Sequence, residues 1–301
     1  MKILVIGGSY FLGRVFLIQT AKSHDITVVN RGTYSVADLG VRQIKGDRKN
    51  PSIWQENKEE YDVIVDFCAY EKNDISTVLE HFSGNAKQYI LISTVDVYKR
   101  GLGQLKTEDT PLETRTISGN AGNYISGKIA LEQELISECE KKNMNYTILR
   151  PSIIYGPFNY APRESVFIQI AVQNKVLVHI TDADGKFQFV YVKDVANAII
   201  ACMRNEIAYN NAYNICSDVI SDYDSFYKEL KKVVDIPVAE QKLTVSEALV
   251  ENTLLPFPAM ADETELCSNE KSIKELGLFY TPFSEGIEKT YNAFKNVFSV
   301  S

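Results

Sequence analysis

The chain begins MKILVIGGSYFLG, residues 1–13, and this stretch decides the expected fold. Residues 1–6 are apolar and β-branched, which is typical of a strand buried on both faces of a parallel sheet. Gly7, Gly8 and Gly13 follow in the pattern G-G-x-x-x-x-G. Glycine lets backbone N–H groups approach a ligand closely, and a helix beginning near Tyr10 points its positive end at an anion. The stretch predicts a phosphate cradle; an ordinary strand-to-helix turn is the alternative.

Composition narrows the class of protein. The 301 residues are 45% apolar with a net charge of -7, which predicts a globular chain and, without a lysine or arginine block, disfavours nucleic acid as a partner. The five cysteines form no C-x-x-C pair and the three histidines share no ligand spacing, so we expect no metal site and a reducing, cytoplasmic location. The sequence holds no signal-peptide pattern and no apolar run long enough for a bilayer, so we expect no membrane partner.

Strand-like and helix-like segments alternate along the first half of the chain. Strands are expected at 1–6, 24–30, 41–46, 61–67, 88–94 and 145–156, with helices at 11–24, 51–57, 74–82 and 124–142. Beyond residue 157 we expect helices at 163–173, 194–204, 221–235 and 269–277 and short strands at 176–180, 187–192 and 213–216. The alternation predicts a doubly wound α/β Rossmann sheet with a smaller C-terminal α/β region that binds substrate. The expected division is 1–157, with returning segments near 185–216, against 158–301.

The residue that ends the second strand of such a sheet discriminates between dinucleotides, because a carboxylate there binds the ribose 2′-hydroxyl and repels a 2′-phosphate. Here the position holds Asn30, followed by Arg31. NADP is therefore favoured over NAD, although Arg31 can also stack on adenine or face solvent. Asp47 and Arg48 follow the third strand, where Asp47 either accepts from the adenine amino group or simply forms a turn.

Tyr124 and Lys128 lie four residues apart at the expected start of the long helix, so their side chains share one helical face. The lysine ammonium, the nicotinamide ring and the helix N-terminus all favour the phenolate, so we expect a lowered pKa and a proton-shuttling Tyr124. Ser93 and Thr94 end the fifth strand and offer a hydroxyl to hold the substrate oxygen.

Five stretches occur in an order and spacing that resemble the extended, NAD(P)-dependent epimerase/dehydratase branch of the short-chain dehydrogenase/reductase superfamily. They are GGSYFLG (7–13), ISTVDVY (92–98), YISGK (124–128), LRPSIIYGP (149–157) and YVKDVANAI (191–199). The resemblance is firm to about Asn214 and implies Thr94, Tyr124 and Lys128 as the catalytic residues. Asp194 is similar to the aspartate that opens a helix of the family's substrate region, where an N-cap role is also sufficient.

The resemblance also implies contacts to each part of the cofactor. Along the pyrophosphate it places Gly7, Ser9, Tyr10, Phe11 and Leu12, with Gly8 and Gly13 shaping the loop. On the adenosine side it places Phe67, Cys68 and Ala69. Beside the nicotinamide it places Arg150, Pro151, Ser152 and Ile153. Independently of the resemblance, side chains with the chemistry to hold a base, a diphosphate or a sugar are Asp96, Tyr155, Tyr160, Arg163 and Tyr191, for most of which packing is an equal explanation.

Two departures from the family pattern shape the expected function. Thr94 is followed by Val95 and Asp96 rather than by the Asp-Glu pair of sugar-nucleotide 4,6-dehydratases, so dehydration is disfavoured. The short connection from Phe67 to Gln88 resembles an atypical subgroup that includes chloroplast stem-loop-binding proteins, so a monomer and a homodimer both stay open. We expect an epimerase or reductase acting on a hydroxyl or keto group of a nucleotide-sugar. The alternatives are a reductase of a non-sugar metabolite and a non-catalytic dinucleotide-binding or RNA-associated scaffold.

Overall fold

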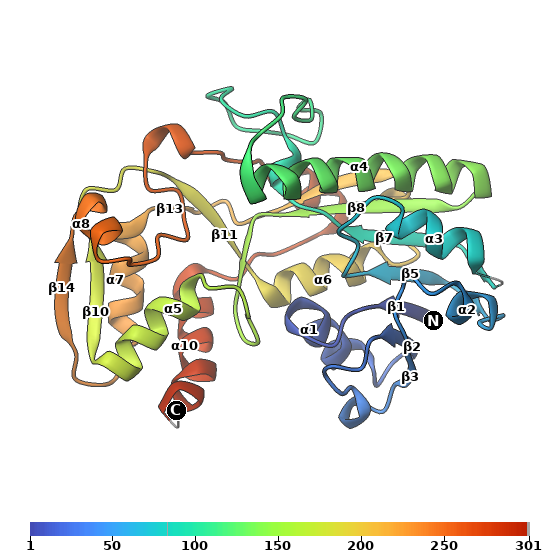
Figure 1. The fold of residues 1–301 in the computed structure, drawn as a ribbon, viewed down its shortest axis with the longest axis horizontal. Coiled ribbons are helices and arrows are strands. Elements are labelled where there is room, and N and C mark those ends of the chain that lie inside the picture. The colour runs from blue at the N-terminus through green and yellow to red at the C-terminus, as the bar shows by residue number, and fades with distance from the viewer. Residues whose placement is uncertain (83, 300–301) are drawn as a thin grey trace.

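The computed structural model describes residues 1–82 and 84–299. Its largest element is a seven-stranded, all-parallel sheet in the order β12-β8-β7-β5-β1-β2-β3 (Figure 1). The strands are β1 (Lys2–Ile6), β2 (Asp25–Asn30), β3 (Arg42–Lys45), β5 (Val63–Asp66), β7 (Gln88–Ile92), β8 (Asn145–Pro151) and β12 (Asn211–Ile215). The order reverses at β1, as in doubly wound sheets, so the expected fold class is confirmed.

Helices cover both faces of this sheet (Figure 1). The helices α1 (Phe11–Thr20) and α6 (Val192–Cys202) pack together on one face, and α2 (Pro51–Gln55), α3 (Asp74–His81) and α4 (Gly119–Lys142) cover the other. Side chains of β1 alternate between the two apolar cores: Ile3 and Val5 join the core of α1 and α6, whereas Leu4 and Ile6 join that of α3 and α4. This period of two explains why an unbroken apolar run makes a doubly buried strand.

A second lobe lies beside the sheet, at the left of Figure 1. Its strands are β9 (Ile153–Tyr155), β11 (Phe187–Tyr191) and β13 (Ile220–Ser221) in one sheet and β10 (Val176–Ile180) with β14 (Ala239–Leu243) in another. Its helices are α5 (Glu164–Gln169), α7 (Tyr223–Val233), α8 (Val245–Val250) and α10 (Phe283–Ser299). A cluster of aromatic rings fills its core, with centroids 4.8 Å apart in the pairs Phe187–Phe257 and Phe189–Phe283.

Three shorter elements complete the described chain. β4 (Glu60–Tyr61) pairs with β6 (Asn85–Ala86), and α9 (Glu270–Leu276) packs against β12 and α6, which returns the C-terminal part to the large sheet. None of the helices in the described ranges is both long and apolar enough to cross a bilayer.

Several expected boundaries are wrong, each for a local reason. The expected strand 145–156 is two strands, because Pro151 has no N–H for the ladder and the chain then pairs with β11 in the other sheet. Helix α4 begins at Gly119, five residues before Tyr124, through glycine- and asparagine-rich sequence of low helix propensity. The expected helix 163–173 is α5 followed by a π-helical segment, Ile170–Asn174. The strand β14 and the helices α8 and α10 were not predicted.

Candidate active site

The glycine loop joins β1 to α1 in the tight geometry that its sequence predicts. Gly7 and Gly8 have φ angles of +81° and +71°, a region that favours glycine. A Cβ atom on Gly13 would lie 2.2 Å from the Cα of Gly8, so the helix packs on the loop only because residue 13 lacks a side chain.

A cavity of about 440 Å³ lies along this loop, where β1, β2, β3 and β5 end; we call it the glycine-loop cavity. The carboxyl ends of the strands are where doubly wound sheets bind ligands. The residues assigned to the cofactor from sequence that line this cavity are Gly7, Gly8, Ser9, Tyr10, Asn30, Arg31, Asp47, Arg48, Phe67 and Cys68.

The end of β2 offers donors rather than a carboxylate. The Asn30 side-chain Oδ1 accepts hydrogen bonds from Gly32 N at 2.9 Å and Gln43 Nε2 at 2.7 Å, and its Nδ2 is buried without a hydrogen-bond partner among the described residues. Arg31 is exposed at the cavity wall. Asp47 Oδ1 accepts from the backbone N of Lys49 at 2.9 Å, so the turn interpretation holds while the carboxyl group still lines the cavity.

Arg48 lines the cavity, but its guanidinium is held by protein groups. It donates to both carboxylate oxygens of Asp66, at 2.9 and 2.8 Å, and to the backbone carbonyl of Asp74 at 2.7 Å. Burial raises the pKa of the fully buried Asp66 carboxyl, but the Arg48 charge together with hydrogen bonds from Arg48, Tyr89 and the Cys68 backbone leaves that pKa below its ordinary value. Arg48 therefore lies at the predicted cavity, but its charged group is bound to Asp66 and to the Asp74 carbonyl.

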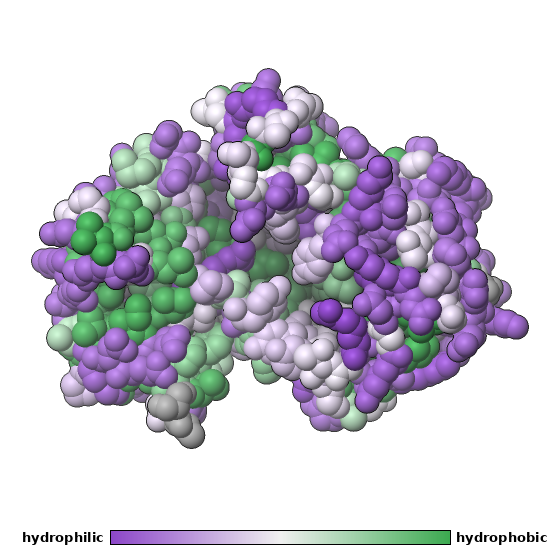
Figure 2. All heavy atoms as spheres, viewed as in Figure 1, coloured by the Kyte–Doolittle hydropathy of each residue, from purple (hydrophilic) through white to green (hydrophobic). Residues whose placement is uncertain are grey.

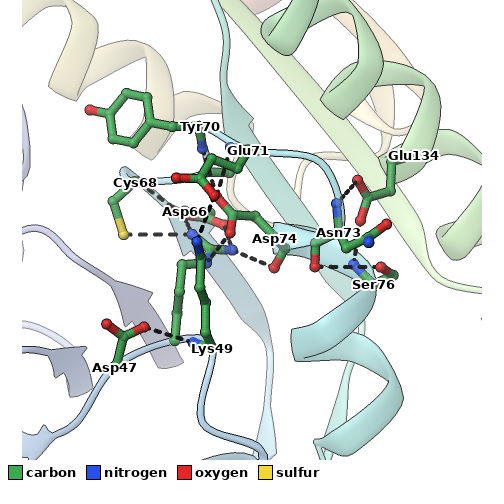
Figure 3. Close-up of polar contacts among 12 residues, drawn as sticks. Asp47, Lys49, Asp66, Cys68, Tyr70, Glu71, Asn73, Asp74, Ser76 and Glu134 are labelled. Carbon is green, nitrogen blue, oxygen red and sulfur yellow. Dashed lines mark hydrogen bonds and ion pairs between the residues drawn. The ribbon is translucent and has the colours of Figure 1, made fainter.

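The loop after β5 is fixed by polar contacts from two neighbouring elements (Figure 3). Glu134 of α4 accepts from the backbone N of Asn73 at 2.9 Å and of Ser76 at 2.7 Å, at the start of α3. Asp74 accepts from the backbone N of Tyr70 at 2.8 Å and of Glu71 at 2.9 Å. These contacts hold Tyr70 at a fixed place between the glycine loop and α4.

A second cavity, of about 390 Å³, lies between the two lobes; we call it the tyrosine cavity. Figure 2 shows the surface hollowed in this region. From the first lobe it is lined by predicted residues, namely Tyr10, Phe11, Leu12, Gly13, Phe67, Thr94, Asp96, Tyr124, Lys128, Pro151 and Ser152, and the predicted Ile153 lines it from β9 of the second lobe. From the second lobe come Tyr160, Ala161, Arg163, Phe187, Gln188, Pro256, Pro258, Glu263 and Glu265.

Tyr124 lines this cavity beside Thr94 and Asp96, and 42% of the residue is exposed. The Thr94 hydroxyl donates to Asp96 Oδ2 at 3.1 Å. Desolvation by the cavity walls, followed by the Asp96 charge, raises the pKa of Tyr124 to about 12, while the Arg163 charge and a hydrogen bond with Thr94 oppose this. The expected lowering of the Tyr124 pKa is thus wrong for the protein alone, and the helix N-terminus that was to contribute lies a full turn away at Gly119.

Lys128 is buried behind the tyrosine and anchored by two carbonyls. Its Nζ donates to the backbone oxygens of Ala69 at 2.9 Å and Ile92 at 3.0 Å. The same atom lies 4.8 Å from the ring centroid of Tyr70 and 5.9 Å from that of Tyr124. Burial lowers its pKa to about 8. Ala69 therefore acts through its carbonyl on Lys128, outside the walls of both cavities.

Tyr160 connects the two cavities, because it lines both. Its ring centroid lies 5.6 Å from that of Tyr10 and 6.0 Å from that of Phe11, both at the glycine loop. Tyr10 in turn stacks on Tyr34 with centroids 4.4 Å apart. A ligand that extends from one cavity into the other passes beside these rings.

Four residues given site roles from sequence lie elsewhere. Tyr155 and Tyr191 are register partners in β9 and β11, and their rings, 5.5 Å apart, face the aromatic core. Asp194 is the third residue of α6, not its N-cap, and its carboxylate holds Thr281 through N at 2.7 Å and Oγ1 at 2.9 Å. Arg150 is buried and donates to Glu132 Oε2 at 2.7 Å rather than facing either cavity.

Sequence reasoning missed several residues that line the two cavities. Arg100 lies four residues after Asp96, and its Nη2 is 3.3 Å from Asp96 Oδ1. Tyr34 and Tyr70 follow β2 and β5, so their place after a strand end was a usable signal. Gln188, Glu263 and Glu265 reach the tyrosine cavity only through the fold of the second lobe, which no local sequence pattern predicts.

The residues present fit a dinucleotide. Side chains at residues 7, 8 and 13 would collide with Cys68, Val5 and Gly8, so the loop keeps its tight path along the cavity only with glycine at these positions. Each cavity also holds a buried polar atom without a hydrogen-bond partner among the described residues: Asn30 Nδ2 in the glycine-loop cavity and Ser152 Oγ in the tyrosine cavity. Such atoms are rare in folded proteins unless a ligand or water satisfies them.

The doubly wound sheet, the glycine loop and the Tyr-x-x-x-Lys pair of α4 resemble those of the extended short-chain dehydrogenase/reductases. Residues 75–216 match the NAD dependent epimerase/dehydratase family, so the resemblance read from the sequence is confirmed.

Among curated proteins, the chloroplast stem-loop binding protein of 41 kDa b from Arabidopsis thaliana is 28% identical over 79% of this chain, a match that spans 65% of that relative's length. The dTDP-D-glucose 4,6-dehydratase of Bos taurus is 25% identical over 80% of this chain and 69% of its own. Among solved structures, UDP-glucuronic acid 4-epimerase from Bacillus cereus, in complex with UDP-glucuronic acid and NAD, superposes with a TM-score of 0.76 at 18% identity, over 99% of this chain and 100% of that one. At that identity the likeness establishes the fold.

Proposed function

We propose that this protein is an NADP-dependent oxidoreductase that acts on a hydroxyl or keto group of a nucleotide-linked sugar, as an epimerase or a reductase. The observation that carries the proposal is the meeting of the two cavities at the glycine loop, with Tyr124, Thr94 and Lys128 grouped in one of them. We assign residues 1–157, with the returning segments near 185–216, to the dinucleotide and 158–301 mainly to the substrate.

Each side chain has a role that its position supports. Tyr124 exchanges a proton with the substrate oxygen, and the Thr94 hydroxyl hydrogen-bonds that same oxygen. Lys128, fixed by its two carbonyls, supplies positive charge that favours the phenolate once a proton has left. The dinucleotide, when bound, supplies or accepts a hydride.

The preference for NADP rests on Asn30 and Arg31. Neither is acidic, so nothing at the end of β2 repels a 2′-phosphate, and the exposed Arg31 guanidinium is suited to bind one. Dehydration is disfavoured, because Asp96 is the only carboxylate in the two positions that follow Thr94, and it already accepts from Thr94 and lies beside Arg100.

A second candidate is an RNA-associated scaffold, favoured by the 28% identity to the stem-loop binding protein. The acidic net charge of -7 argues against it, because phosphate contacts need Lys and Arg. Retention of labelled RNA on filters, weakened by salt, supports the scaffold if no hydride transfer accompanies it.

The test of the enzyme combines nicotinamide absorbance with product analysis, using NADP(H) or NAD(H) and a panel of UDP- and dTDP-sugars. A stoichiometric change in absorbance indicates a reductase, whereas an isomer formed without net change indicates an epimerase. Tyr124→Phe is expected to lower the rate by about 10²- to 10⁴-fold, the usual contribution of a general acid or base. Tyr209→Phe, outside both cavities, is the control. Wild-type rates in Tyr124→Phe, or no turnover of any sugar, contradict the proposal.

A further inference from the structure

Arg163 brings a positive charge into the tyrosine cavity that the described residues leave unmatched. It lines that cavity, and no described carboxylate lies within ion-pair distance of its guanidinium. Its one side-chain hydrogen bond in the described part of the chain runs from Nη1 to the backbone oxygen of Ile154, at a long 3.4 Å. A planar guanidinium that is mostly free of protein partners is suited to bind an oxyanion with two parallel hydrogen bonds.

The other charged side chains that line the cavity each contact another group of the protein. Asp96 lies 3.3 Å from Arg100, and Glu265 forms an ion pair with the buried Lys106. Glu263 accepts from the backbone N of Ala259 at 2.8 Å and of Met260 at 3.0 Å. The Lys128 ammonium is held by its two carbonyls. A ligand in this cavity therefore meets two guanidinium groups with free donors among the described residues: Arg163, which has no carboxylate partner, and Arg100, which is paired with Asp96.

The loop that carries Arg163 fixes it near the reacting phenol. Its backbone N donates to the backbone oxygen of Ala161 at 2.8 Å. The next residue, Glu164, is fully buried and accepts from Gly156 N at 3.1 Å and from Asn159 Nδ2 at 3.0 and 2.9 Å. The guanidinium is close enough for its charge to act on Tyr124.

We propose that Arg163 binds a carboxylate or phosphate group of the substrate, close to the carbon on which Tyr124 acts. The inference rests on the proposed function and adds to it the group of the substrate that Arg163 recognises, an anion. Two sources share this chemistry: an acidic group on the sugar itself, and the diphosphate that links the sugar to its nucleotide.

Binding to the NADP-loaded protein, measured by calorimetry, separates the two sources. The probes are UDP-glucuronic acid, UDP-glucose and UDP, of which the first two differ in one carboxylate. If the sugar's own anion is bound, UDP-glucuronic acid binds about tenfold or more tighter than UDP-glucose, and Arg163→Gln removes the difference. If the diphosphate is bound, Arg163→Gln weakens all three probes alike. Arg163→Lys is expected to retain part of the affinity in either case, because lysine keeps the positive charge but lacks the paired N–H donors of the guanidinium.

Arg42→Gln, an exposed arginine on β3 away from both cavities, controls for the loss of one positive charge. Unchanged affinity for all three probes in Arg163→Gln overturns the inference. If no UDP compound binds the wild type, the nucleotide-sugar proposal fails instead, and the inference is tested with malonate and pyrophosphate. A rise in melting temperature with these anions that Arg163→Gln abolishes supports it, and an equal rise, or none, in both proteins overturns it.

Discussion

At the scale of single residues, the site holds its acid and base groups in states that a bound ligand must change. Tyr124 has a pKa of about 12 because the cavity desolvates it and Asp96 lies nearby, and Lys128 has a pKa of about 8 because it is buried. A positively charged nicotinamide ring placed against the phenol would lower the pKa of Tyr124, whereas desolvation and the Asp96 charge both raise it. The protein alone therefore presents a protonated phenol, and the phenolate depends on the complex.

Glu164 carries a pH dependence that stability measurements can detect. Burial raises its pKa from 4.5 to about 7, and hydrogen bonds from Asn159 and Gly156 only partly oppose this. When folding raises the pKa of a carboxyl group, the folded protein keeps its proton at pH values where the unfolded chain has lost it. The free energy of unfolding is therefore highest below the pKa of the unfolded chain and falls as the pH rises to the pKa of the folded protein.

Between about pH 4.5 and pH 7 the free energy of unfolding of the wild type should therefore fall relative to Glu164→Gln, by about 3 kcal/mol in total. Urea unfolding of both proteins across this pH range measures the difference between their free energies of unfolding. The titratable groups that the two proteins share cancel in this difference. A difference that stays constant with pH, or that grows in favour of the wild type, contradicts the assigned shift.

At the scale of elements, α4 is joined to the sheet by a buried ion pair behind the active site. Glu132 of α4 accepts from Arg150 of β8 at 3.0 and 2.7 Å and from the Ser93 hydroxyl at 2.5 Å. Arg150 also donates to the Tyr98 hydroxyl at 2.9 Å. This network sets the position of α4, and with it of Tyr124 and Lys128, relative to the end of β7.

Removing one partner of such a pair leaves an uncompensated buried charge, which costs more than the pair itself contributes. Glu132→Ala should lower the free energy of unfolding by about 3–5 kcal/mol, measured by urea denaturation. The double variant Glu132→Leu with Arg150→Met should recover most of that loss, because no charge then remains buried. A loss below about 1 kcal/mol in the single variant would mean that water reaches Arg150.

At the scale of the whole molecule, the sequence predicts the large sheet well because its strands are local signals. Apolar runs such as Ile3 to Ile6 predict buried strands. The glycine loop and the spacing of Tyr124 and Lys128 depend only on local backbone and helical geometry. The second lobe is different. For Tyr155 and Tyr191 the sequence left substrate contact and packing as equal explanations, because their direction depends on how β9 pairs with β11, a contact between segments far apart in sequence.

The same limit applies within the candidate site. Arg150 follows the family pattern by position, yet its buried partner Glu132 lies on another element and turns it from the cavity. Arg163 was only one of several possible substrate contacts in sequence, since its unmatched charge is visible only when the partners of Asp96, Glu263 and Glu265 are known. Contacts between distant segments thus determine which side chains face a cavity, and periodicity and spacing in the sequence do not predict those contacts.

The central claim is that a dinucleotide spanning the two cavities converts Tyr124 into a proton carrier. The most direct test is a pH titration of phenolate absorbance, taken as the difference between wild type and Tyr124→Phe so that the other tyrosines cancel. Without cofactor, the difference signal should stay absent until pH approaches 12. With saturating NADP⁺ it should appear several pH units lower, and a midpoint that NADP⁺ does not move would contradict the account.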